Sequence, residues 1–96
     1  LPEAVALLRR EGFSGVVMSA SLPATTLATG GTVAQSAVAA LRAGCDLLYV
    51  PGDARDQEAA YRAVVRAVKN GTVSSARYRE ALSRVIALKR AFRPRS

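Results

Sequence analysis

Few side chains in this chain could act as an acid, a base, a nucleophile or a metal ligand. Its 96 residues include no His, one Cys, and seven Asp or Glu. Structural zinc sites need several His or Cys ligands, so we expect no metal site. Cys45 has no second cysteine to pair with and no His to activate it, which is typical of an inert, packed thiol.

Two hydroxyl groups, those of Ser19 and Ser21, flank Ala20 at the end of a short apolar run. The run, residues 15–19 (GVVMS), is rich in β-branched residues and is followed by a loop-like stretch of small residues, 20–31. This pattern predicts a strand buried on both faces. A serine hydroxyl is a weak nucleophile without an adjacent base, and the chain has no His to serve as one.

Two carboxylates bracket a second apolar run, residues 46–50 (DLLYV), which Pro51 and Gly52 terminate. This run predicts a second buried strand. Asp46 would begin that strand. Asp53 follows it, and we interpret Asp53 mainly as a turn residue or the N-cap of the next helix.

Apolar periodicity predicts four helices around these strands. We expect them at residues 3–11, from Thr32 to Gly44, at residues 56–69, and from Ser74 or Ser75 onward with Phe92 on the core side. Thr32 and Gln35, three residues apart, form the capping-box pattern that begins a helix.

The order helix, strand, helix, strand, helix, helix indicates an α/β fold with a parallel sheet that helices cover. Two parallel strands cannot close such a sheet. A (β/α)8 TIM barrel has about 30 residues per strand-helix unit, because about 250 residues form eight units. We therefore expect the last part of a barrel, incomplete on its own.

The net charge of +7 is concentrated in the second half, where residues 55–96 carry eleven Lys or Arg and three Asp or Glu. These bases recur at helical spacing opposite apolar positions, which is typical of solvated helix faces. Aromatic residues are too few for base stacking, so we expect no dedicated nucleic-acid role. No apolar stretch is long enough to span a bilayer, and no signal peptide is recognisable. The cellular compartment stays open.

Three segments resemble family 3 glycoside hydrolases, in that family's order. The first is LLRREGFSGVVMSASL, which resembles a helix running into the strand that bears the nucleophile, ending in Ser-Asp-x-Leu. The second is ALRAGCDLLYVPGD, similar to the last barrel strand, and the third is AVKNGTVSSARYREALSRVIALKRAF, similar to the closing helix. The resemblance implies that residues 1–96 are the C-terminal segment of such a barrel, closer to the β-N-acetylhexosaminidase-like branch.

The resemblance implies a retaining glycosidase, which uses two carboxyl-type groups about 5 Å apart and no metal or organic cofactor. By the motif, Ala20 stands at the position of the nucleophilic Asp, where it offers only a methyl group. Ser19, Ser21 and Leu22 match the flanking positions, and with Asp53 they are candidate substrate-binding residues. Asp46 would lie at the opposite, stability-related end of the barrel.

Ala20 allows two explanations, a natural family member that has lost hydrolysis or an Asp→Ala change made to trap substrate. Ala24, where the family often has Met, is a second departure and favours natural loss. The acid/base residue of the N-acetylhexosaminidase branch, a His on an earlier loop, would fall outside this segment.

The expected function is thus part of a family 3 domain that acts on or binds β-linked (N-acetyl)glucosaminyl sugars of cell-wall fragments or glycans, with impaired hydrolysis. The alternative is a catalytically dead module that binds carbohydrate or a protein partner. In both cases the expected partners are a carbohydrate ligand and the remainder of the barrel, in the same protein or a second chain.

Overall fold

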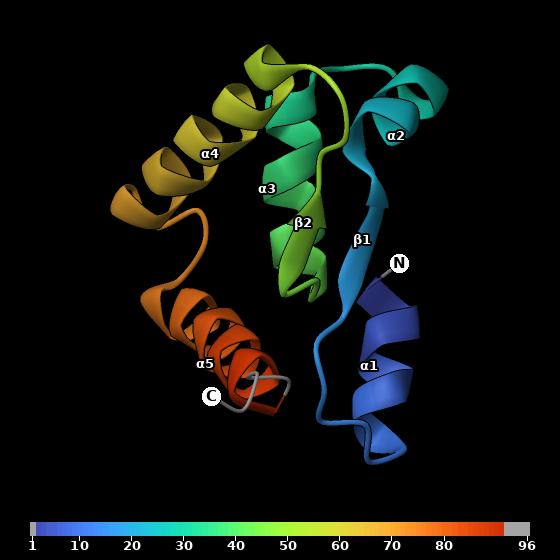
Figure 1. Cartoon of the computed structure of the whole chain (residues 1–96), viewed down its shortest axis with the longest axis vertical. Helices are drawn as coiled ribbons and strands as arrows, with labels where there is room; N and C mark the ends of the chain where they lie inside the picture. Colours follow the sequence, from blue (N-terminus) through green and yellow to red (C-terminus); the bar gives the residue numbers. More distant parts are fainter. Residues whose placement is uncertain (1, 92–96) are drawn as a thin grey trace, which may run out of the picture.

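The computed structural model describes residues 2–91, which form helices around a parallel pair of strands (Figure 1). Along the chain the elements are α1 (Pro2–Arg10), β1 (Met18–Ser21), α2 (Leu22–Thr29), α3 (Val33–Ala43), β2 (Leu47–Tyr49), α4 (Ala54–Lys69) and α5 (Ser75–Ala91). Helices α2 and α3 connect the strands, and α3 packs against α4. The expected α/β arrangement of two parallel strands with flanking helices is confirmed. Phe92 lies outside the described residues.

Helix α3 has the ends that the sequence predicted. The Thr32 side chain accepts a hydrogen bond from the N–H of Gln35, and the Gln35 side chain accepts one from the N–H of Thr32, so the capping box is confirmed. At the other end Gly44 adopts a left-handed conformation with φ of 111°. A β-carbon there would lie 2.6 Å from Cγ1 of Val5, because α1 approaches the end of α3 closely.

Strand β1 begins three residues later than the predicted start at Gly15. Several backbone groups before Met18 bond to side chains. The Arg9 guanidinium donates to the carbonyl of Gly15 (2.6 Å), and the N–H of Val17 donates to Oδ2 of Asp46 (3.1 Å). The carbonyl of Val17 already accepts hydrogen bonds from the N–H groups of Asp46 (2.7 Å) and Leu47 (3.3 Å), so side chains replace a neighbouring strand only for the backbone before that carbonyl.

The stretch predicted as a loop, residues 20–31, contains helix α2. Ser21 caps it, and the hydroxyl groups of Thr25, Thr26 and Thr29 each donate to the carbonyl four residues earlier. The loop prediction was wrong because threonines and alanines without a wide apolar stripe give little helical signal.

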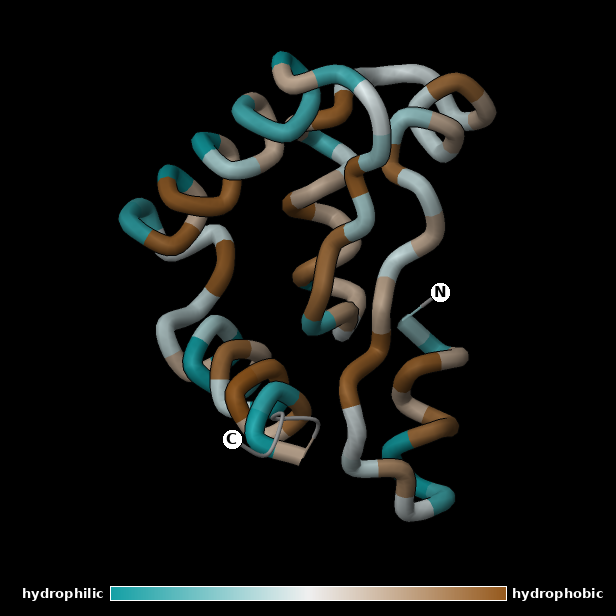
Figure 2. The backbone as a smooth tube through the Cα atoms, viewed as in Figure 1, coloured by the Kyte–Doolittle hydropathy of each residue, from teal (hydrophilic) through white to brown (hydrophobic). Residues whose placement is uncertain are grey.

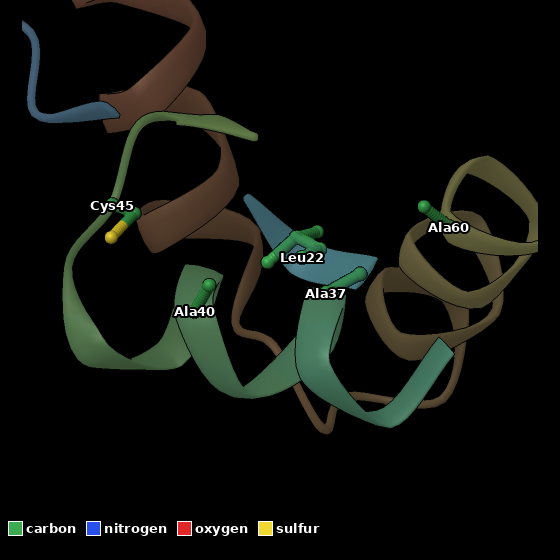
Figure 3. Packing of buried hydrophobic residues seen from close by; sticks show 5 residues of the cluster. All are labelled: Leu22, Ala37, Ala40, Cys45 and Ala60. Carbon is green, nitrogen blue, oxygen red and sulfur yellow. The ribbon is translucent and has the colours of Figure 1, made fainter. Parts of the chain in front are cut away.

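The main core lies between the helix-facing side of the strands and helices α3 and α4. Figure 3 shows its buried side chains, which are Leu22, Ala37, Ala40, Cys45 and Ala60. The alanines let α3 and α4 approach closely. Partly buried side chains from these helices, from β2 and from the residues beside the strands fill the space around them, and they are Val17, Val33, Leu48, Val50 and Val64. A second cluster joins α3, α4 and α5 through Leu41, Ala67, Val73 and Ala81.

The opposite side of the strand pair is uncovered in the described residues. Met18, Leu47 and Tyr49 are between 39% and 58% exposed, and Figure 2 shows apolar segments on the strands and along α5. The prediction of strands buried on both faces is therefore wrong for this chain, because nothing in residues 2–91 covers these side chains. Parallel sheets are normally covered on both faces. Within residues 2–91, we found no helix with the length and apolar content needed to span a membrane.

Candidate functional site

The two strands are parallel, so their carboxyl ends lie at the same end of the sheet. The end of β1 carries Ala20 and Ser21, and the segment after β2 leads to Asp53 at the start of α4. In sheets of this kind, binding sites form from the residues that follow the carboxyl ends of the strands. The candidate residues from the sequence therefore share one end of the fold.

Ala20 is exposed, and it borders a groove of about 410 Å³. The groove runs between β1 and helices α1, α2 and α3. The residues that line it are Pro2, Val17, Met18, Ser19, Ala20, Leu22, Thr25, Thr29, Ser36, Ala39, Ala40 and Cys45. None of these carries a charged side chain. The groove accordingly offers hydroxyl groups and apolar surface, and nothing that could attack or protonate a glycosidic bond.

Ser19 is buried and its hydroxyl is fully engaged within the sheet. Its Oγ accepts a hydrogen bond from the N–H of Tyr49 (2.9 Å) and donates one to the carbonyl of Ala20 (2.8 Å). No base contacts this hydroxyl in the described residues, so it is not set up as a nucleophile.

Ser21 and Leu22 begin helix α2. Oγ of Ser21 accepts a hydrogen bond from the N–H of Ala24 (3.4 Å), and its carbonyl accepts one from the hydroxyl of Thr25. Leu22 is 2% exposed and belongs to the main core. The two residues therefore set the direction of α2 as it leaves the end of β1.

Asp53 is the N-cap of α4, as the sequence predicted. Its Oδ1 accepts a hydrogen bond from the N–H of Arg55 (2.8 Å), which satisfies one of the free donors at the start of the helix. The side chain of Gln57 reaches back to the carbonyl of Val50 (3.1 Å) and fastens the connection between β2 and α4. Asp53 is exposed at this end of the sheet, so its carboxylate is open to solvent.

A larger cluster of charges lies around Asp46, just before the amino end of β2. The Asp46 side chain has no exposed area and bonds three guanidinium groups, those of Arg9 (2.7 Å), Arg77 (3.0 Å) and Arg84 (3.1 Å). Burial alone would raise the pKa of Asp46, but the N–H of Val17 and the guanidinium groups outweigh it and hold the pKa below its ordinary 3.8. The carboxylate is therefore ionised and committed to structure.

Sequence reasoning placed Asp46 at this end but missed its partners. They come from α1 and α5, and the pairing of residues more than thirty positions apart left no local signal. Glu80 of α5 joins the cluster by contacting Arg77 and Arg84. No group of three or more His, Cys, Asp or Glu in the described residues is arranged to hold a metal ion.

Comparisons with known proteins identify the family. The profile described as "Glycosyl hydrolase family 3 N terminal domain" matches residues 3–88. An uncharacterized secreted glycosyl hydrolase from Arthroderma benhamiae is 35% identical over 83 residues, which is 85% of this chain and 24% of that protein. The solved structure of a glycoside hydrolase family 3 beta-N-acetylglucosaminidase from Paenibacillus sp. str. FPU-7 has a TM-score of 0.81 and 33% identity over 88% of this chain and 16% of its own.

The chain belongs to glycoside hydrolase family 3. It spans about a quarter of the length of the Arthroderma relative and a smaller share of the Paenibacillus structure.

Proposed function

We propose that residues 1–96 are the C-terminal segment of a family 3 (β/α)8 barrel that binds β-linked N-acetylglucosaminyl sugars at the carboxyl ends of its strands. Within residues 2–91, the parallel pair has an uncovered face with exposed apolar residues, and each strand has a free edge. The missing strands and helices of a barrel would cover both, whether they belong to the same polypeptide or to a second chain. The name of the Paenibacillus neighbour supports the choice of sugar.

The observation that carries the proposal is the position of Ala20. It is an exposed residue in the carboxyl-terminal half of β1, where the family motif has its nucleophilic Asp. A methyl group cannot form a glycosyl ester and cannot stabilise the positive charge of an oxocarbenium-like transition state. We therefore infer that the barrel recognises the sugar but hydrolyses it poorly.

Restoring the carboxylate tests this function. In the complete protein that contains residues 1–96, Ala20→Asp should raise hydrolysis of an aryl β-N-acetylglucosaminide by at least about a thousandfold, since nucleophile removal typically costs this much or more. Calorimetry with N-acetylglucosamine oligosaccharides should show binding in the protein with Ala20 as well.

Ala24→Asp is a matched control, because it adds the same charge four residues away in the first turn of α2, where helices accept acids. It should leave hydrolysis unchanged. If Ala20→Asp gives no hydrolysis while sugars still bind, the protein is the binding module of the alternative hypothesis. If neither hydrolysis nor binding is detected, the proposal is wrong.

A further inference from the structure

The pairing of the two strands is irregular beside position 20. Met18 is the register partner of Leu47, and Ser21 is the partner of Tyr49, so three steps along β1 match two steps along β2. Strand β1 thus holds one extra residue, in a β-bulge made by Ser19 and Ala20. Bulges bend a strand, redirect side chains and are common next to active sites.

A bulge leaves backbone groups without their usual partners in the neighbouring strand. Here one hydroxyl replaces the missing pairing. Oγ of Ser19 lies 2.9 Å from the N of Tyr49, which donates to it, and 2.8 Å from the carbonyl oxygen of Ala20, to which it donates. Ser19 is 7% exposed, so water has little access to these groups. A single buried side chain thereby ties residue 20 to β2.

We propose that Ser19 is a positioning residue whose hydroxyl holds the bulge and so fixes the direction of the side chain at position 20. This inference rests on the proposed function, because position 20 matters for hydrolysis only if it is the nucleophile position. Without the hydroxyl, the N–H of Tyr49 and the carbonyl of Ala20 lose a partner in poorly hydrated surroundings. The bulge then loses the bonds by which Ser19 ties residue 20 to β2.

Ser19→Thr and Ser19→Val provide a matched pair, since the two side chains have nearly the same shape and only threonine keeps the hydroxyl. The first readout is the amide hydrogen exchange of Tyr49 in the complete protein. The second uses Ala20→Cys and measures the rate and pH profile with which the introduced thiol is alkylated by iodoacetamide. Cys45 is 1% exposed and contributes little to this signal.

We expect Ser19→Thr to leave both readouts within about twofold of the parent. Ser19→Val should speed amide exchange at Tyr49 by about tenfold, which is the change expected for the loss of one hydrogen bond. Ser19→Val should also shift the pH profile of alkylation at position 20. Ser74→Ala is the control, because the Ser74 hydroxyl caps the start of α5 by accepting from the N–H of Arg77 and bonds neither Tyr49 nor Ala20. Equal exchange and equal alkylation in folded Ser19→Thr and Ser19→Val proteins overturn the proposal. If Ser19→Val does not fold, Ser19→Ala takes its place in the same comparison.

The Ala20→Asp protein distinguishes a failure of the role proposed for Ser19 from a failure of the proposed function. Where Ala20→Asp restores hydrolysis, Ser19→Val should lower kcat about tenfold with little change in KM, and Ser19→Thr should recover it. An unchanged kcat would also overturn the role of Ser19. Where Ala20→Asp stays inactive, the proposed function fails, and exchange at Tyr49 with thiol alkylation still decides whether Ser19 holds position 20.

Discussion

Asp46 and Arg77 are 31 positions apart in the chain, yet Nη1 of Arg77 lies 3.0 Å from Oδ1 of Asp46. The same guanidinium donates to the carbonyls of Leu41 (2.9 Å) and Cys45 (2.6 Å), at the end of α3 and in the turn that enters β2. Arg9 of α1 binds the other carboxylate oxygen. One buried carboxylate thus connects the first helix, the start of β2 and the last helix, at the end of the sheet opposite to that of Ala20.

Removing this carboxylate should destabilise the protein strongly. We expect Asp46→Asn to lower the free energy of unfolding by about 3 kcal/mol, because three guanidinium groups then face a neutral side chain. Urea unfolding measures the change. Glu58→Gln is the control, since Glu58 and Arg62 form an exposed i, i+4 pair, and its loss should cost less than about 0.5 kcal/mol. Similar costs for the two variants would contradict the structural role of Asp46.

The stability of the protein should depend on pH through the same group. The pKa of Asp46 is lowered in the folded state, so between that value and its ordinary 3.8 the unfolded chain binds more protons. The stability from Asp46 is therefore fully present above the ordinary pKa and is lost as the pH falls through the folded pKa. Unfolding measured from pH 7 down to pH 2 should show a decline that Asp46→Asn makes smaller. An equal decline in both proteins would show that other carboxylates cause it.

Gly44 should not tolerate a side chain. Gly44→Ala places a β-carbon 2.6 Å from Cγ1 of Val5 at a residue with positive φ, and we expect it to cost about 2 kcal/mol or more. Gly71→Ala has the positive φ without any atom within 4 Å and should cost about 1 kcal/mol. Thermal unfolding compares them. Adding Val5→Ala should recover part of the loss in the Gly44→Ala protein and none in the Gly71→Ala protein.

The thiol of Cys45 should be unreactive in the folded protein. Burial raises the pKa of Cys45 above its usual 9.0, although the nearby Arg77 opposes this effect, and the side chain lies in the main core. A disulfide reagent such as DTNB should label it roughly a hundredfold more slowly than it labels the unfolded chain. Ala28→Cys, which adds a thiol on the exposed side of α2, should react at once in the folded state. Rapid labelling of Cys45 would mean that this core opens easily.

The sequence predicted most of the fold because most of the signals were local. The apolar periodicity of α1, α3, α4 and α5 and the capping box at Thr32 depend on residues within one or two helical turns. The N-cap role of Asp53 was equally local, and the order of elements implied a parallel sheet. Helix α2 was missed because its threonine hydroxyls bond their own backbone, and its sequence has no wide apolar stripe that would indicate a helix.

At the candidate site, the family motif predicted that Ala20 stands at the nucleophile position, but the sequence did not predict the surroundings of this residue. Whether Ala20 would be exposed, and how Ser19 would be used, depended on the register between β1 and β2. That register contains a bulge, which no pattern within residues 15–22 indicated.

The sequence by itself determined the family, the kinds of elements and the absence of an acid at position 20, since these follow from residue identity and short-range spacing. Only the tertiary structure decided where β1 begins, which hydroxyl completes the bulge, and how three arginines meet at Asp46. Those contacts join residues about thirty or more positions apart. Their geometry arises when the helices pack on the strands, and no local segment of the chain specifies it.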